Sequence, residues 1–154
     1  MTDFDVVIVG QGLAGTTLAL HLIAAGQRVL VLDAGTPVTA SKIAAGLMTP
    51  ITGQRLTLSW RVDEFLPYAR EFYARIEQET GRAFCHDRIA VRLFTKQAER
   101  AVFDQRQADP QFRAHLAEAA VDVVLPDDVA DTEGGGFSIH AAQLDVAKFL
   151  AAAR

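Results

Sequence analysis

The residues whose types and spacing indicate a function most clearly are three glycines near the start of the chain. Gly10, Gly12 and Gly15 form a G-x-G-x-x-G spacing directly after an apolar run. The first glycine of this pattern allows a tight turn, the second lets a diphosphate approach the backbone, and the third lets a helix pack closely on a strand. The spacing therefore predicts a dinucleotide-binding turn.

Amide groups and an acid complete this pattern. The N–H groups of Leu13 and Ala14 lie at the start of the helix that we expect to follow the turn, where they attract an anion. Asp33 comes 21 residues after Gly12, which suits hydrogen bonds to the adenosine ribose and disfavours the 2′-phosphate of NADP. FAD and NAD both fit these residues. The alternative is that the glycines mark an ordinary turn and that Asp33 is a solvated strand end.

The elements around these residues predict a compact βαβ unit. Residues 4–9 and 28–33 are short β-branched runs typical of parallel strands buried on both faces. Between them, residues 13–25 have helical periodicity, with Leu18, His21, Leu22 and Ala25 on the apolar side, and Gly26 ends the helix. We therefore expect an α/β, Rossmann-like fold.

The rest of the chain predicts a second region that begins after Gly81. We assign residues 1–81 to the first part of a cofactor domain and residues 82–154 to the start of an α+β substrate or cap domain. Before Gly81 we predict a loop over 34–59 and a helix over 63–80 with Pro67 in its first turn. After Gly81 we predict a strand over 88–94, a helix capped by Thr95 and ending near 108, and a short helix with Phe112 and Leu116 inward. A strand over 121–125, a turn over 126–136, a strand over 137–140 and a helix over 142–153 complete the prediction.

The motifs resemble a known family. The stretch from Asp5 to Gly15, together with Asp33, resembles the opening of FAD-dependent oxidoreductases. The loop from Thr39 to Leu47 is similar to that of the D-amino-acid oxidase group, which includes glycine oxidase and sarcosine oxidase. Residues 48–53, Trp60 and the helix after it are similar to bacterial members. The resemblance is specific over residues 1–60 and looser over residues 82–154.

The resemblance implies FAD as the cofactor and a set of residues that bind it. This set is Gly10, Gly12, Leu13, Ala14, Gly15, Asp33, Ala34, Ser41, Ala45, Gly46, Leu47 and Met48. Small residues in the loop from Ala44 to Met48 would let its backbone approach a planar ring. Two alternatives stay open: this loop merely connects two elements, and Ser41 caps a turn instead of binding phosphate.

The resemblance further implies an oxidoreductase that oxidises an amine or amino acid by hydride transfer to flavin N5. A hydroxylase-type flavin monooxygenase and a non-catalytic dinucleotide-binding module are the alternatives. No catalytic residue is assigned, because related enzymes place their substrate-binding groups mostly in later sequence. We expect the rest of such an enzyme to lie outside these 154 residues. The piece alone is then expected to be inactive and to self-associate.

Composition excludes several other classes of protein. Fifteen basic residues against 19 acidic ones give a net charge of −4, which does not suit a nucleic-acid partner. The apolar stretch over 13–25 is too short for a membrane span, and we expect a cytoplasmic protein. Cys85 is the only cysteine, so an internal disulfide is excluded and no metal site is expected. The run Cys85-His86-Asp87 is not expected to form a triad, and His21 is expected to lie in the core.

Overall fold

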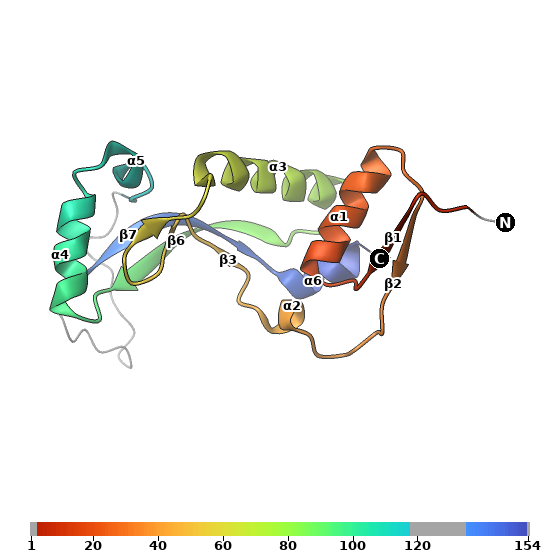
Figure 1. Cartoon of the computed structure of the whole chain (residues 1–154), viewed down its shortest axis with the longest axis horizontal. Helices are drawn as coiled ribbons and strands as arrows, with labels where there is room; N and C mark the ends of the chain where they lie inside the picture. The colour runs from red at the N-terminus through yellow and green to blue at the C-terminus, as the bar shows by residue number, and fades with distance from the viewer. Residues whose placement is uncertain (1–2, 118–134, 154) are drawn as a thin grey trace. The chain divides into compact units, whose positions relative to one another are not determined.

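The structure is a computed structural model that describes residues 3–117 and 135–153. Its residues form two compact units, which are treated separately below; Figure 1 shows the elements along the chain. The first unit comprises Met1–Gly46, Phe72–Cys85 and Leu144–Arg154, and the second comprises Leu47–Glu71 and His86–Gln143. Both units are discontinuous in sequence. The predicted assignment of residues 1–81 and 82–154 to cofactor and substrate domains remains a prediction.

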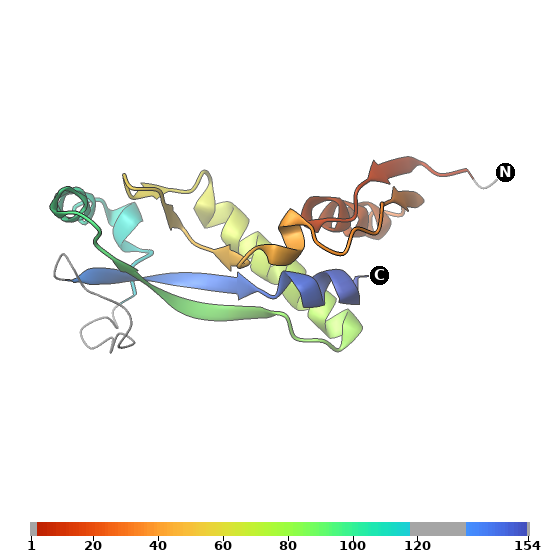
Figure 2. The ribbon, with the colours of Figure 1, turned by 90° about the horizontal axis from the view of Figure 1, so that it is seen from below.

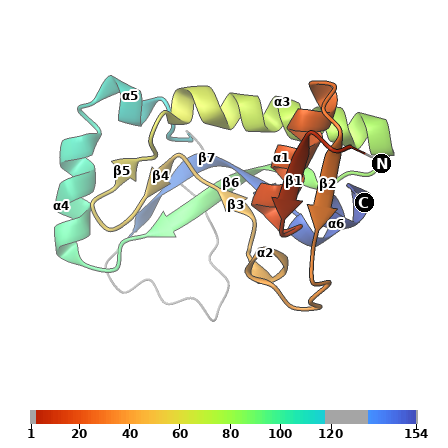
Figure 3. The same cartoon turned by 45° about the vertical axis from the view of Figure 1, so that its right-hand side comes forward.

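A parallel βαβ element opens the first unit, as predicted. Strands β1 (Val6–Val9) and β2 (Val29–Leu32) pair in parallel register from Val6–Val29 to Val9–Leu32. Helix α1 (Leu13–Ala24) connects them, and Figure 3 shows it beside the two strands. Gly26 follows the helix with a φ of +79°, a left-handed conformation that glycine adopts without strain.

The two faces of this strand pair differ in burial, so the prediction of strands buried on both faces is wrong. Ile8 is buried, whereas Val7 and Val9 are 54% and 84% exposed. The predicted apolar side of α1 is only partly correct, because Thr16 and Ala19 are the buried residues, His21 and Leu22 are half-buried, and Leu18 is half exposed. Small side chains let α1 approach the strands closely, which decides the buried side of the helix.

Aromatic residues from three segments form the core of the first unit. Helix α3 (Val62–Thr80) matches the prediction within one residue, although Pro67 lies inside the helix and not in its first turn. Tyr73 on α3 packs edge-to-face on Phe149 of helix α6 (Val146–Ala152), with ring centroids 5.2 Å apart, and Phe84 packs on the same ring at 5.4 Å. Burial raises the pKa of Tyr73 to about 12.

The predicted loop over residues 34–59 is wrong, because it contains four short elements. These are α2 (Ala40–Ile43), β3 (Leu47–Met48), β4 (Ile51–Thr52) and β5 (Thr57–Leu58). Strands β4 and β5 form an antiparallel hairpin whose turn uses left-handed backbone at Gly53 and Leu56. The Leu56 side chain is completely buried. Strands of two residues are too short to show a periodic pattern in the sequence.

Strand β3 also belongs to a three-stranded sheet with β6 (Cys85–Leu93) and β7 (Gly136–Leu144), in the order β3-β7-β6. Strand β6 is longer than predicted, and β7 pairs antiparallel with β3. The N–H of Phe94 donates to the carbonyl of Gly135 at 3.1 Å, so the end of β6 lies against the start of β7. Figure 2 shows these two strands side by side.

The C-terminal helix begins later than predicted. Residues 142–144 belong to β7, and Asp145 caps α6 by accepting a hydrogen bond from the Lys148 N–H at 3.0 Å. Alanines at 141 and 142 permit either a helix or a strand, and burial beside neighbouring strands decides for the strand. The predicted strand over 121–125 and all but the last two residues of the predicted turn over 126–136 lie outside the described residues.

Helices α4 (Gln97–Arg106) and α5 (Pro110–Arg113) accompany the core of the second unit. The predicted inward position of Phe112 is confirmed, because this side chain is almost fully buried. The buried apolar residues of this core are Ile51, Leu56, Phe94, Phe112, Phe137 and Ile139. They come from the β4–β5 hairpin, from β7, from Phe94 directly after β6, and from α5.

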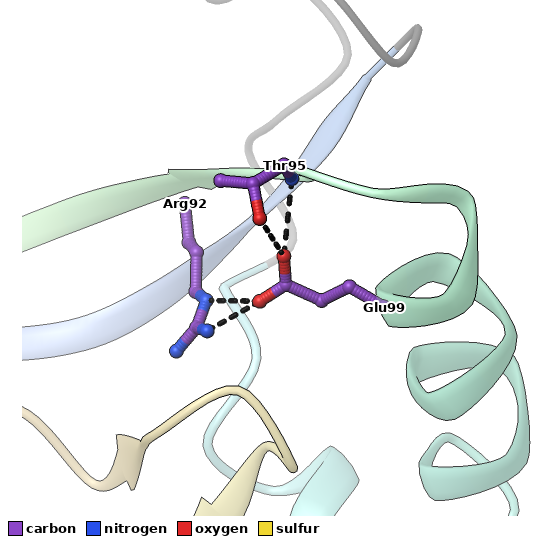
Figure 4. A network of polar contacts seen from close by, with 3 residues as sticks. All are labelled: Arg92, Thr95 and Glu99. Atoms are coloured by element: carbon purple, nitrogen blue, oxygen red, sulfur yellow. Dashed lines mark hydrogen bonds and ion pairs between the residues drawn. The ribbon is translucent and has the colours of Figure 1, made fainter.

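A buried acid fixes the start of α4. One carboxylate oxygen of Glu99 accepts hydrogen bonds from the N–H and the hydroxyl of Thr95, both at 3.0 Å, and the other oxygen pairs with Arg92 (Figure 4). Lys96, and not Thr95 as predicted, is the N-cap residue. Burial raises the pKa of Glu99, but the bonds from Thr95 and Arg92 outweigh this effect and hold it below its ordinary value.

We predict that Glu99→Gln lowers the free energy of unfolding by about 3 kcal/mol, because the substitution leaves Arg92 without its charged partner. This figure is at the low end for a buried pair, since the Arg92 side chain is 26% exposed. Glu79→Gln is the matched control, because Glu79 lies 3.9 Å from Arg75 on the surface and should contribute less than about 0.5 kcal/mol. Urea unfolding measures both, and equal effects would contradict the assignment.

The same pair predicts a dependence on pH. The pKa of Glu99 is lower in the folded than in the unfolded chain, so its stabilisation is complete above the unfolded pKa and is lost as the pH falls through the folded pKa. The difference in stability between wild type and Glu99→Gln should therefore shrink below about pH 5. A difference that stays constant down to pH 3 would show that the carboxylate charge is not the cause.

Candidate functional site

The glycine turn packs directly against the helix that follows it. Gly10 has a φ of +98°, and its N–H donates to the carbonyl of Leu32 at 2.7 Å. A Cβ atom on Gly15 would lie 1.9 Å from the carbonyl oxygen of Gly10 and 3.3 Å from the Ile8 side chain. Only glycine fits at position 15, which is the packing role that the sequence predicts for it.

The start of α1 presents amide groups and a hydroxyl group at one point. Gly12 is the N-cap residue and supplies no side-chain cap, and the first turn contains no acidic residue. The N–H of Leu13 donates to Ser41 Oγ at 3.0 Å, and a Cβ on Gly12 would lie 3.0 Å from the same oxygen. Because Ser41 accepts this bond, its own O–H proton is available to donate. The arrangement suits a phosphate group.

Asp33 links the glycine turn to the segment after β2. Its Oδ2 accepts a hydrogen bond from the Gln11 N–H at 2.7 Å, and its Oδ1 accepts one from the Gly35 N–H at 2.8 Å. The carboxylate is exposed at the carboxyl end of the parallel strands, beside the amides of α1. This is the edge of a parallel sheet at which open α/β folds bind their ligands. Ala34 is also exposed there.

Gly46 has a structural role that the sequence does not reveal. Its φ is +68°, its carbonyl accepts a hydrogen bond from the Leu144 N–H at 2.9 Å, and a Cβ at this position would lie 1.8 Å from the Leu144 carbonyl oxygen. Close packing against the end of β7 is therefore sufficient to require a glycine. Leu47 and Met48 form β3 in the second unit, opposite Gln143 and Ala142.

The predicted binding residues thus divide into two groups. The structure brings together those of the glycine turn, the start of α1, Asp33 and Ser41, all in the first unit. It fixes Gly46 by a different contact, to Leu144. The sequence analysis missed Lys42, whose ammonium group donates to the carbonyls of Thr36 at 2.8 Å and Pro37 at 3.3 Å and closes the loop before α2. Only the capping residue Thr39, three residues earlier, hinted at this short helix.

Other candidate residues serve the fold. His21 stacks on the buried ring of Phe72 at 4.5 Å, and its Nδ1 lies 2.7 Å from the Thr17 carbonyl oxygen, so it packs against the core although the residue itself is only half-buried. Asp87 pairs with Arg70 at 3.0 Å, which argues against the sequential triad. Within residues 3–117 and 135–153, no group of three potential metal ligands occurs. In the same part of the chain, no helix is long and apolar enough to cross a membrane.

Comparison with known proteins agrees with this geometry. Residues 5–154 match the family model described as FAD dependent oxidoreductase, abbreviated DAO. An uncharacterised oxidoreductase, YurR of Bacillus subtilis strain 168, is 41% identical over 54 residues, which are 35% of this chain and 14% of that protein. The bifunctional protein ThiO/ThiG of Trichormus variabilis is 34% identical over 82 residues, which are 50% of this chain and 12% of that protein.

Two solved structures share the fold. Glycine oxidase from Bacillus cereus ATCC 14579 aligns with a TM-score of 0.62 at 18% identity, covering 98% of this chain and 44% of that one. Iminodiacetate oxidase from Chelativorans sp. BNC1 aligns with a TM-score of 0.54 at 21% identity, covering 96% of this chain and 42% of that one. This chain thus spans less than half the length of these solved relatives and a smaller share of the two related by sequence.

The packing of Gly46 predicts that Gly46→Ala destabilises the first unit strongly. Gly53→Ala is the matched control, because both glycines have a φ of +68° but no atom lies within 4 Å of a Cβ at position 53. We expect about 1 kcal/mol from backbone strain at position 53 and at least about 2 kcal/mol more at position 46, where the carbonyl of Leu144 must move. Urea unfolding of both variants measures the difference, and equal losses would contradict the contact.

Proposed function

The chain belongs to the DAO family of FAD-dependent oxidoreductases, and we propose that it forms the dinucleotide-binding part of an enzyme that oxidises an amine or an amino acid. The observation that carries this proposal is the junction of the α1 amide groups, Ser41 and Asp33 at the glycine turn. Residues 1–81 and 82–154 are then proposed to contribute to the cofactor and substrate domains.

The residues present fit the adenosine diphosphate part of FAD. The start of α1 offers a helix dipole with no acid in the first turn, which favours the diphosphate, while the Leu13 N–H itself donates to Ser41 Oγ. Ser41 adds a hydroxyl donor at the same point. Asp33 offers a carboxylate next to these amides, where it would accept hydrogen bonds from ribose hydroxyls. Hydrogen-bond donors for the diphosphate therefore lie near a carboxylate acceptor for the ribose, which supports the proposal.

In the reaction that we propose, the role of this chain is to bind and orient FAD. The glycine turn and the start of α1 would hold the diphosphate, and Asp33 would hold the adenosine ribose. The backbone of residues 44–46 is proposed to approach the ring system, because alanine and glycine side chains leave room for a planar ring. When bound, FAD would accept a hydride, which carries two electrons and one proton, at its N5 atom. No residue of this chain is assigned as a catalytic acid or base.

The names of the solved relatives support the proposed substrate class. Glycine and iminodiacetate are both amines with a carboxylate on the carbon next to nitrogen. At 18% and 21% identity the relatives share the fold, so the particular amine oxidised by this protein is not inferred from them. We propose an amine with a hydrogen on the carbon next to nitrogen, because hydride transfer requires that hydrogen.

We predict that the intact protein binds FAD and that an amino acid or amine bleaches its flavin absorbance in the absence of oxygen. A panel that includes glycine, iminodiacetate and D-amino acids tests the substrate class, with the corresponding alcohols as controls. Bleaching by NADPH alone would contradict amine oxidation and favour a hydroxylase-type monooxygenase. Failure to bind FAD at all would favour a non-catalytic module.

The proposed ribose contact predicts that Asp33→Asn weakens FAD binding by about 1–3 kcal/mol, because a charge-assisted acceptor is lost. Asp104→Asn removes the same charge from an exposed position on α4 and should leave FAD affinity unchanged. Titration of the apoprotein by flavin fluorescence measures both affinities, and circular dichroism checks that the fold is retained. Wild-type affinity in Asp33→Asn would rule out the ribose contact.

A further inference from the structure

An open hollow in the second unit lies apart in sequence from the residues of the proposed dinucleotide site. Its volume is about 330 Å³, at the lower end of the range for small-molecule sites. Helix α3 and strands β6 and β7 supply its lining, which consists of Arg70, Asp87, Arg88, Ile89, His140 and Ala141. The proposed function uses none of these residues.

The two guanidinium groups of the hollow donate hydrogen bonds to the surrounding chain. Arg70 Nη2 donates to the Ala141 carbonyl at 3.3 Å, so the side chain from α3 is fixed against β7. Arg88 Nε donates to Gln143 Oε1 at 3.3 Å, and its Nη1 donates to the Asp87 carbonyl at 3.2 Å. These three acceptors are uncharged. They orient the two groups without neutralising them.

The charge balance of the hollow favours an anion. Arg70 and Arg88 carry two positive charges and Asp87 carries one negative charge, which leaves +1 with His140 counted as neutral. Asp87 lies 3.0 Å from Arg70, but its side chain is 83% exposed, and ion pairs of exposed groups are weak. A carboxylate from solution can therefore compete with Asp87 for Arg70.

The hydrogen bonding of Arg70 is incomplete. Its Nε is buried and has no acceptor among the described residues. A guanidinium group has five N–H donors in a planar fork that matches the two oxygens of a carboxylate. A small shift of Arg70 toward a ligand would give this donor a partner, whereas the ion pair with Asp87 uses Nη2.

We propose that this hollow binds a small organic monocarboxylate. The carboxylate would contact Arg70 and Arg88, and the hydrocarbon part would lie against Ile89 and Ala141. A single negative charge balances the +1 of the lining, whereas a phosphate dianion would leave an excess of negative charge. Ile89 is 48% exposed, so a ligand can still cover apolar surface there.

Ligand-observed NMR on the intact protein, at constant ionic strength, tests the proposal with three probes. Hexanoate is the carboxylate, hexanamide is its neutral analogue and inorganic phosphate is the competing anion. We expect hexanoate to bind with a Kd on the order of 1 mM and hexanamide about tenfold more weakly. Equal binding of hexanoate and hexanamide, or tighter binding of phosphate than of hexanoate, would overturn the proposal.

Paired variants locate the site. Arg88→Leu should weaken the binding of hexanoate about tenfold. Arg82→Leu removes an exposed charge outside the hollow and should change the Kd of hexanoate less than about twofold. Asp87→Asn removes the competing carboxylate and should tighten binding about threefold, whereas Asp104→Asn should not. Equal effects within either pair would show long-range attraction only and would overturn the assignment. Thermal unfolding confirms that each variant is folded.

Discussion

The proposed dinucleotide site depends on one close contact, between the start of α1 and the turn before it. Because a Cβ on Gly15 would lie 1.9 Å from the Gly10 carbonyl oxygen, the helix rests on the turn with backbone against backbone. This approach places the first amides of α1 at the carboxyl ends of β1 and β2. Ser41 reaches the Leu13 N–H there, and Asp33 reaches the Gln11 N–H. A larger residue at position 15 would move the helix and separate these groups.

The two proposed sites would recognise charge by different physical means. In the first unit, backbone amides and a helix dipole carry partial positive charge, which suits a large diffuse anion that needs several donors. In the second unit, fixed guanidinium groups carry full charges on side chains anchored by neutral acceptors. Its buried acid, Glu99, is already satisfied by Arg92 and Thr95, so it serves the fold.

Local patterns in the sequence predict the βαβ element and most of α3, because strand runs, the glycine spacing and helical periodicity depend on neighbouring residues. The predicted packing role of Gly15 is confirmed for the same reason. The elements within residues 34–59 were not predictable, since two-residue strands exist only through their partners. The partner of Gly46 comes from β7, so no local signal reveals it. The predicted helix is wrong at residues 142–144 for a similar reason, because burial in a sheet overrides their helical preference.

The contact between Gly46 and Leu144 has a consequence for how the protein is made. The ribosome synthesises the chain from the N-terminus at roughly 5–20 residues per second, so the βαβ element emerges well before β7. Until Leu144 has been translated, the backbone bend at Gly46 has neither its hydrogen-bond donor nor its packing partner. Nascent chains arrested before this residue would contain the glycine turn but not the final conformation of the loop after Ser41.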